Sequence, residues 1–472
     1  MASNKTNAHA AAEPAALAEA EVIQQPPADP ELVARVAFQH TVQTVDADGV
    51  KQDATTLASR LQHMSIGAQT VHADDFLNSH PSVAPPMHVS TTFRYSRDPE
   101  DLKPGANISS VNPYDSHIYS RMSAPNAQRF EAILTSILHG PSLAYTSGLS
   151  AFHALLVLVN PRRIAIGDGY HGCHGVIRVF SRLTGLEQVD LDCDDSELGP
   201  GDLIHVETPL NPSGEARDLA RYAAKARRVG AVLSVDATFA PPPLLDPFRF
   251  GADVVMHSGT KYFGGHSDML CGVLAVAPRR AQEWIPRLVE ERLFLGAVMG
   301  SLEGWLGIRS LRTLELRVAK QSADAERLVR WLAAERARGE GDGQDGRSIV
   351  ARHVADIKHA SLQVDPETGE APAWLREQMP NGFGPVFSLY MRDEDDARRL
   401  PSKLHLFHHA TSLGGVESLI EWRSMTDAGC DKRLLRLSIG VEGWEDLRDD
   451  LQQGFEALAR DRASAAKADG KA

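Results

Sequence analysis

Two side chains that could carry out chemistry together follow two predicted strands. Asp236 follows the apolar run 231–235, and Lys261 comes shortly after the run 252–256. Ligands of open α/β sheets bind beyond the carboxyl ends of the strands, so we expect both side chains at one edge. Pyridoxal 5'-phosphate (PLP) needs a lysine for its Schiff base, an acid for its pyridine nitrogen and hydroxyls for its phosphate. Ser258 and Thr260 beside Lys261 supply hydroxyls.

The segments around these residues predict the sheet that positions them. Short apolar runs at 163–166, 203–206, 231–235 and 252–256 alternate with helix-length segments. One of these segments, 219–229, is a predicted crossover helix that ends at Gly230. Such alternation indicates βαβ units, and therefore an α/β fold with a mainly parallel sheet and helices on both faces.

The chain divides into four stretches of different character. Residues 1–60 are rich in Ala, Glu and Pro and are predicted to be mostly disordered; residues 61–116 form an N-terminal arm. Residues 117–308 form the large domain, and 309–472 a smaller C-terminal α+β domain. Predicted elements near and beyond that boundary are a long helix over 304–336, strands at 386–390 and 434–438, and a helix over 444–458.

Composition narrows the classes of function. The 472 residues include 62 acidic and 49 basic side chains, a net charge of −13, which disfavours nucleic acid as a partner. Apolar residues make up 43% of the chain, enough for a large core, and no run reaches the ~20 residues of a membrane span. The four cysteines form no C-x-x-C pair, which favours a reducing compartment. We therefore expect a cytoplasmic protein without membrane or nucleic-acid partners.

A longer motif around the lysine carries a family resemblance. The segments 234–240, Ser-Val-Asp-Ala-Thr-Phe-Ala, and 258–268, Ser-Gly-Thr-Lys-Tyr-Phe-Gly-Gly-His-Ser-Asp, resemble the cystathionine γ-synthase/γ-lyase family of fold-type I PLP enzymes. The resemblance covers about residues 65–460. It implies that Lys261 binds PLP and acts as the catalytic base, that Asp236 pairs with the pyridinium nitrogen, and that the Ser258 and Thr260 hydroxyls bind phosphate.

Further segments occur in the family's order and imply more cofactor contacts. Backbone N–H groups at the start of a helix suit a phosphate. The segment 119–121, Tyr-Ser-Arg, resembles the family's Tyr-x-Arg motif, which reaches the cofactor of the neighbouring subunit. The resemblance therefore implies a homodimer or homotetramer with shared active sites. The implied contacts are Gly148 and Leu149 at the phosphate, Tyr170 stacked on the ring, Asn211 near the ring's 3' oxygen, and Tyr119 and Arg121 from the neighbouring subunit.

The resemblance also implies which residues bind the substrate. Arg436 is similar to the arginine that clamps the substrate α-carboxylate, and Ser412 lies near it in the family. Thr411 stands where γ-synthases and γ-lyases often have an acid, and Trp422-Arg423 departs from the family's Pro-Ala segment. These departures concern the distal substrate pocket. The run 421–423, Glu-Trp-Arg, resembles the fungal γ-synthase-like branch.

The resemblance implies γ-replacement on an activated homoserine ester, with cysteine or another sulfur or carbon nucleophile as the second substrate. Lys261 would move the α-proton, and Tyr119 or Tyr170 would assist near the leaving group. Elimination by a cystathionine or methionine γ-lyase is an alternative that the pocket departures leave open. A regulatory paralogue that binds PLP without turnover is another; intact Lys261, Asp236 and Arg436 weigh against it. A purely structural role is disfavoured by the polar residues that follow the strands.

Histidines and one cysteine raise the question of a metal. The clusters His171-Gly-Cys173-His174 and His405 to His409 contain ligand types that zinc prefers. Neither forms a complete set at structural-zinc spacing, so we predict no metal site.

Overall fold

The computed structural model describes residues 44–45, 51–52, 61, 63–78, 81–102, 117–338 and 346–469. The predicted disordered extension lies outside the described residues, except for β1 (Thr44–Val45) and β2 (Lys51–Gln52), which pair antiparallel. Part of the predicted arm, 103–116, also lies outside them. Helix α3 (Ile66–His72) belongs to the described part of that arm.

Seven strands form the central sheet in the order β3-β9-β8-β7-β6-β4-β5. Strand β9 runs antiparallel to its neighbours β3 and β8, and the other neighbouring strands pair in parallel. The predicted mainly parallel sheet is therefore confirmed. The strands are β3 (Ser142–Tyr145), β4 (Arg163–Ile166), β5 (Glu187–Val189), β6 (Leu203–Glu207), β7 (Val232–Asp236), β8 (Val254–Ser258) and β9 (Gly272–Val276).

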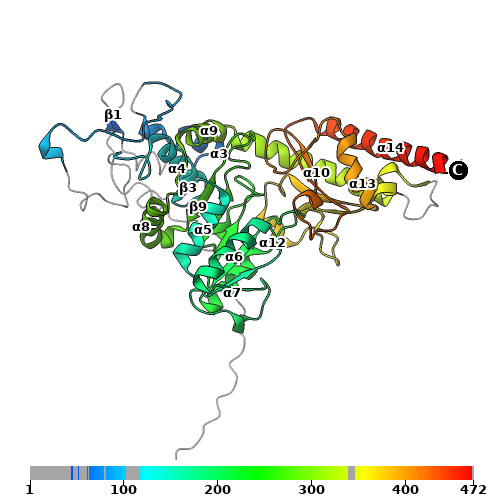
Figure 1. Cartoon of the computed structure of the whole chain (residues 1–472), viewed down its shortest axis with the longest axis horizontal. Coiled ribbons are helices and arrows are strands. Elements are labelled where there is room, and N and C mark those ends of the chain that lie inside the picture. Colours follow the sequence, from blue (N-terminus) through cyan, green and yellow to red (C-terminus); the bar gives the residue numbers. More distant parts are fainter. Residues whose placement is uncertain are drawn as a thin grey trace, which may run out of the picture.

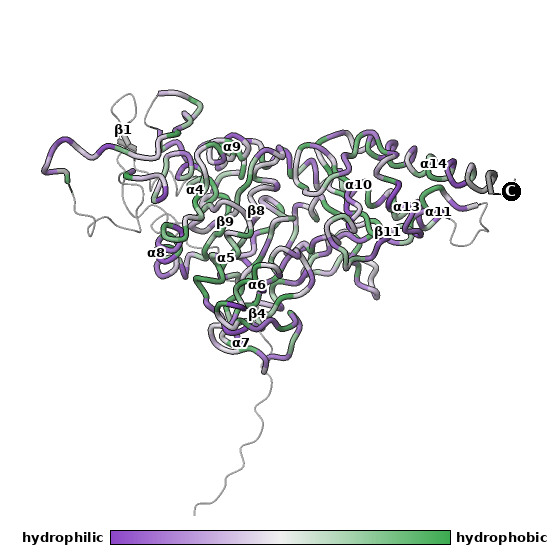
Figure 2. Tube along the Cα trace, in the orientation of Figure 1, coloured by the Kyte–Doolittle hydropathy of each residue, from purple (hydrophilic) through white to green (hydrophobic). Residues whose placement is uncertain are grey.

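Helices cover both faces of this sheet because successive strand residues point to opposite sides. On β8, Val254 and Met256 pack into a core with α5, α6 and α8, whereas Val255 packs into a core with α4, α7 and α9. Figure 2 shows hydrophobic residues gathered around α5 and β9 at the centre. These helices are α4 (Pro125–Ile137), α5 (Gly148–Val159), α6 (His171–Thr184), α7 (Leu219–Val229), α8 (Pro278–Leu295) and α9 (Ser301–Leu311).

Helix α7 matches the predicted crossover helix from its first residue to its last. The Asp218 side chain accepts hydrogen bonds from the backbone N–H groups of Ala220 and Arg221, and Gly230 caps the other end. The helix returns the chain from β6 to β7 and so places the ends of these two neighbouring strands side by side.

The long helix predicted over 304–336 is two helices, α9 and α10 (Leu314–Ala337). Arg312 lies at the break, and its guanidinium donates to the carboxylate of Asp74, 2.6 Å away, just beyond α3. This distant contact fixes the junction, and a continuous helical pattern in the sequence carries no sign of it.

A second sheet of five strands lies at the end of the molecule that also carries α14 (Figure 1). Its order is β10-β11-β14-β13-β12, antiparallel except between β12 and β13. Helices α10 and α14 pack on it in a shared apolar core. The elements are β10 (Val354–Lys358), β11 (Val386–Met391), β12 (His408–His409), β13 (Leu419–Trp422), β14 (Leu434–Ser438), α11 (Ile349–His353), α12 (Ala373–Gln378), α13 (Glu394–Arg399) and α14 (Trp444–Asp469).

The second sheet confirms the smaller α+β part of the predicted fold. Both predicted strands are present as β11 and β14, and the predicted helix over 444–458 continues to Asp469. The predicted domain boundary at residue 308 falls inside α9, and the four-part division stays a prediction. Within the described ranges, no helix combines the length and apolar character that crossing a membrane requires.

Candidate active site

A cavity of about 500 Å³ lies at the carboxyl edge of the central sheet. The last residues of three adjacent parallel strands line it: Glu207 of β6, Asp236 of β7 and Ser258 of β8. The segment 411–413 and Arg436 on β14 complete the opposite wall. Both sheets therefore contribute to one cavity, at the edge where the sequence predicts a ligand site.

Lys261 lies three residues beyond the end of β8 and lines the cavity. Its Nζ donates a hydrogen bond to the hydroxyl of Ser412, 2.7 Å away. Burial, together with the nearby positive charge of Arg436, lowers the pKa of Lys261 from 10.5 to about 8. An amine with a lowered pKa in a cavity is the nucleophile that a Schiff base to an aldehyde requires.

Asp236 is buried at the end of β7, with its side chain against the cavity. One carboxylate oxygen accepts hydrogen bonds from the backbone N–H of Thr238 at 3.0 Å and from its hydroxyl at 2.5 Å. Burial nevertheless raises the pKa of Asp236 above its ordinary value. A protonated pyridine nitrogen beside this carboxylate would stabilise its charged form, so the residue fits the role expected of it.

The amino terminus of α5 forms the end of the cavity that fits a phosphate. Ser147 caps the helix, and Gly148 and Leu149 line the cavity with the first backbone N–H groups. A Cβ on Gly148 would lie 3.1 Å from the Cβ of Ser258, so glycine leaves room for a ligand between helix and strand. Thr260 also lines the cavity, but its hydroxyl contacts the backbone of Cys271. Its predicted phosphate contact stays a prediction.

Tyr170 stands at the start of α6 and lines the cavity beside the strand ends. Its backbone N–H donates to the carboxylate of Glu207 at 2.7 Å, and the backbone N–H of Asn211 donates to the same carboxylate at 2.7 Å. Burial, followed by the charge of Asp236, raises the pKa of Glu207 to about 8. Glu207 therefore holds the loops that carry two predicted cofactor contacts.

Arg436 is buried on β14 and faces the cavity. Its guanidinium donates to the side-chain oxygen of Asn211 at 3.1 Å and to the carbonyl of Ser412 at 2.9 Å, and it pairs with Glu421 at 2.6 Å. Thr411 lines the cavity next to Ser412. The structure thus brings together all three predicted substrate residues around the lysine.

Tyr119 and Arg121 are the two predicted site residues that lie outside the walls of this cavity. Tyr119 is 42% exposed and pairs with Thr92, and Arg121 donates to the carbonyl of Leu293 at 3.0 Å. Residues that contact the cofactor of a neighbouring subunit would lie outside the cavity of their own subunit. The shared site stays a prediction, which the molecular mass in solution would test first.

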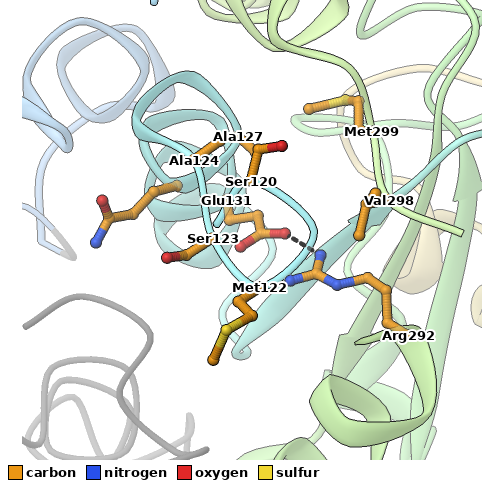
Figure 3. A pocket seen from close by; sticks show the side chains of 10 residues that line it. Ser120, Met122, Ser123, Ala124, Ala127, Glu131, Arg292, Val298 and Met299 are labelled. Atoms are coloured by element: carbon orange, nitrogen blue, oxygen red, sulfur yellow. Dashed lines mark hydrogen bonds and ion pairs between the residues drawn. The ribbon is translucent and has the colours of Figure 1, made fainter. Parts of the chain in front are cut away.

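The segment after Arg121 borders a second, far smaller cavity of about 10 Å³ (Figure 3). Met122 and Ser123 line it, and the ion pair between Arg292 and Glu131 crosses it. This volume suits about one water molecule, so the small cavity is no rival site for a cofactor. In the described part of the chain, no cluster of three or more His, Cys, Asp or Glu side chains has the arrangement to hold a metal ion.

Several residues that line the cavity carry no assigned role in the sequence analysis, and three of them make polar contacts that bear on the site. Their contacts become visible only in the folded chain: Glu207 accepts from the backbone of Tyr170, Thr238 donates to Asp236, and Arg423 pairs with Glu421. Glu207 precedes a Thr-Pro step at a strand end, which is the one sequence signal among them. They are Glu207, Thr238 and Arg423.

The lowered pKa of Lys261 makes a testable prediction about cofactor capture. The rate at which the cofactor-free chain binds PLP should rise as the pH passes through about 8, because the uncharged amine is the reactive form. Stopped-flow absorbance at a series of pH values measures this rate. A rate that rises only near the ordinary lysine value of 10.5 would contradict the burial effect.

PLP is the cofactor that these side chains fit. A mainly parallel sheet with helices on both faces and a lysine just beyond the end of one strand is the arrangement of fold-type I PLP-dependent enzymes. The comparisons with known proteins agree. Residues 67–456 match the model of the family described as Cys/Met metabolism PLP-dependent enzyme. The chain belongs to this family, and it is a PLP-dependent enzyme.

Relatives within the family include both lyases and synthases. The chain is 30% identical to cystathionine γ-lyase of Saccharomyces cerevisiae over 414 residues, which cover 82% of this chain and 96% of the relative. It is 32% identical to cystathionine γ-synthase of Escherichia coli over 403 residues, 79% of this chain and 93% of the relative. The crystal structure of the yeast γ-lyase superposes with a TM-score of 0.70 at 27% identity, covering 84% of this chain and 98% of that one.

Proposed function

We propose that the chain catalyses γ-replacement on an activated homoserine ester, with a thiol or carbon nucleophile as the second substrate. The observation that carries the proposal is the position of Lys261, whose amine lies in one cavity with Asp236 and Arg436. The similarity to the Escherichia coli cystathionine γ-synthase supports it. So does the Bacillus subtilis cystathionine γ-synthase/O-acetylhomoserine (thiol)-lyase, which is 28% identical over 394 residues.

Each residue has a distinct task in this reaction. Bound PLP draws electrons from the α-carbon of an amino acid and so eases the loss of a proton there. Arg436 binds the α-carboxylate and orients the α-carbon toward Lys261. The Lys261 amine then accepts the α-proton, since its lowered pKa leaves part of it uncharged at neutral pH. The Ser412 hydroxyl holds that amine at 2.7 Å.

Loss of a second proton, from the β-carbon, supplies the electron pair that expels the γ-substituent into the part of the cavity bordered by Tyr170 and Thr411. In the proposal, Tyr170 donates the proton to the leaving group. Burial raises the pKa of its hydroxyl, so it stays protonated and able to donate at neutral pH. The neutral side chain of Thr411 replaces a negative charge, which makes this region less repulsive to an anionic leaving group.

The test supplies O-acetylhomoserine with and without a thiol, and separately cystathionine, and follows the products by mass spectrometry. Replacement predicts a new thioether that appears only when the thiol is present. Release of a keto acid and ammonia from cystathionine, without thioether formation, would instead identify a γ-lyase. The chain is 30% identical in sequence to the yeast cystathionine γ-lyase, so the same experiment also tests this second function.

A further inference from the structure

Two arginines in the cavity wall share one buried carboxylate. Glu421 and Arg436 are register neighbours on β13 and β14, and their side chains pair at 2.6 Å. Arg423, just after β13, donates to the same oxygen of Glu421 at 3.0 Å. All three residues are at most 5% exposed, and both arginines line the cavity.

The charges of this group leave one unit of positive charge at the wall. Burial by itself would raise the pKa of Glu421, but the charge of Arg436, the Thr426 hydroxyl and Arg423 together lower it, so the carboxylate is ionised. Glu421 alone would cancel the charge of Arg436. Arg423 adds a second guanidinium. Glu207 is a further acid whose charge acts on Arg436, and burial raises its pKa, which favours its protonated, neutral form.

The contacts of Arg423 within the protein are incomplete. Its terminal nitrogen donates to Glu421 and to the hydroxyl of Thr426 at 3.1 Å, whereas its buried Nε has no hydrogen-bond partner among the described residues. A buried charge with an unsatisfied donor destabilises the folded chain. A buried donor without a partner needs an explanation, and at Arg423 it belongs to a side chain that lines the cavity.

We propose that Arg423 is a positioning residue for substrate binding. Glu421 neutralises the positive charge of Arg436, and the guanidinium of Arg423 makes the net charge of the cavity wall positive again. With Arg423 present, the wall is cationic and attracts the α-carboxylate of an amino acid to Arg436. Without it, the remaining pair of Arg436 and Glu421 carries no net charge. This inference rests on the proposed role of Arg436 and concerns a position where the sequence departs from its family resemblance.

The test compares the binding of two ligands that differ by one carboxylate, L-alanine and ethylamine. The absorbance change of the PLP-loaded chain on ligand addition gives both dissociation constants without any turnover. In Arg423→Gln, L-alanine should bind more weakly, on the order of tenfold, while ethylamine is unaffected. Arg423→Lys keeps the charge and should bind L-alanine nearly as the unchanged chain does.

The decisive test is a double variant that removes the charges of both Glu421 and Arg423. Glu421→Gln combined with Arg423→Gln restores one net positive charge, and binding of L-alanine should return to within about threefold of the unchanged chain. Glu421→Gln alone should bind L-alanine at least as tightly as the unchanged chain. A double variant that binds L-alanine as weakly as Arg423→Gln would overturn the proposal, since the effect would then be structural.

Two controls separate the remaining explanations. Arg433→Gln removes an exposed arginine paired with Asp431 and should change neither constant. Melting temperatures show whether each variant is folded. If Arg423→Gln weakens L-glutamate but not L-alanine, Arg423 binds a distal acid and the proposal is wrong. Failure of the unchanged chain to respond to any amino acid would refute the proposed function instead.

Discussion

Lys261→Ala should leave a folded but colourless chain whose turnover falls by at least about 10³-fold. The alanine removes the amine that binds PLP covalently and the base that accepts the α-proton. Lys261 makes its hydrogen bond to Ser412 at the cavity wall rather than in an apolar core, so the fold should survive the change. Absorbance of the purified protein and steady-state product formation measure the two effects.

The matched control is Lys432→Ala, which removes an exposed lysine, in the turn before β14, that pairs with Glu394 at the start of α13. This variant should keep both colour and turnover. Borohydride reduction followed by peptide mass spectrometry locates the modified lysine in the unchanged chain. Finding the cofactor on any lysine other than Lys261 would refute the assignment.

Asp236→Asn should retain the yellow colour but lower turnover by about 10²–10⁴-fold. The amide keeps the shape of the side chain and removes the charge that stabilises a protonated pyridine nitrogen. The buried position of Asp236 increases the effect, because charges interact more strongly where water is excluded. Rates measured with saturating PLP separate this loss from weaker cofactor binding.

Thr238→Val serves as the comparison for Asp236→Asn. It removes the hydroxyl that donates to Asp236 at 2.5 Å but leaves the carboxylate charge in place. The loss in turnover should therefore be much smaller than for the amide. Equal losses in the two variants would show that hydrogen bonding, and not charge, is the property that matters at this position.

The sequence predicts the parts of this protein that depend on local pattern. Helix α7 follows from an Asp at its start, a Gly at its end and an apolar face between them. The strand-end positions of Asp236 and Lys261 follow from short apolar runs, because parallel strands bring their carboxyl ends to one edge. The cavity contains both residues together with Arg436, although 175 positions separate Lys261 from Arg436 in the chain (436 − 261).

Contacts between distant segments could not be predicted in this way. The break between α9 and α10 depends on Arg312 and Asp74, which lie far apart in the sequence. The pairing of Arg436 with Glu421 depends on the register of β13 against β14, which a run of apolar residues does not specify. Side-chain partners of this kind become visible only once the strands are paired.

The loop that follows β6 joins the two sheets tightly. Gly214 has a φ of +73°, and a Cβ there would overlap the carbonyl of Val386 on β11. Its own carbonyl accepts from the backbone of Ala360, and Ser388 donates to Pro212 at 2.9 Å. Asn211 belongs to the same loop and contacts Arg436. Any rotation of one sheet against the other would consequently move the Asn211 side chain at the cavity wall, so the relative position of the two sheets and the shape of the cavity are linked.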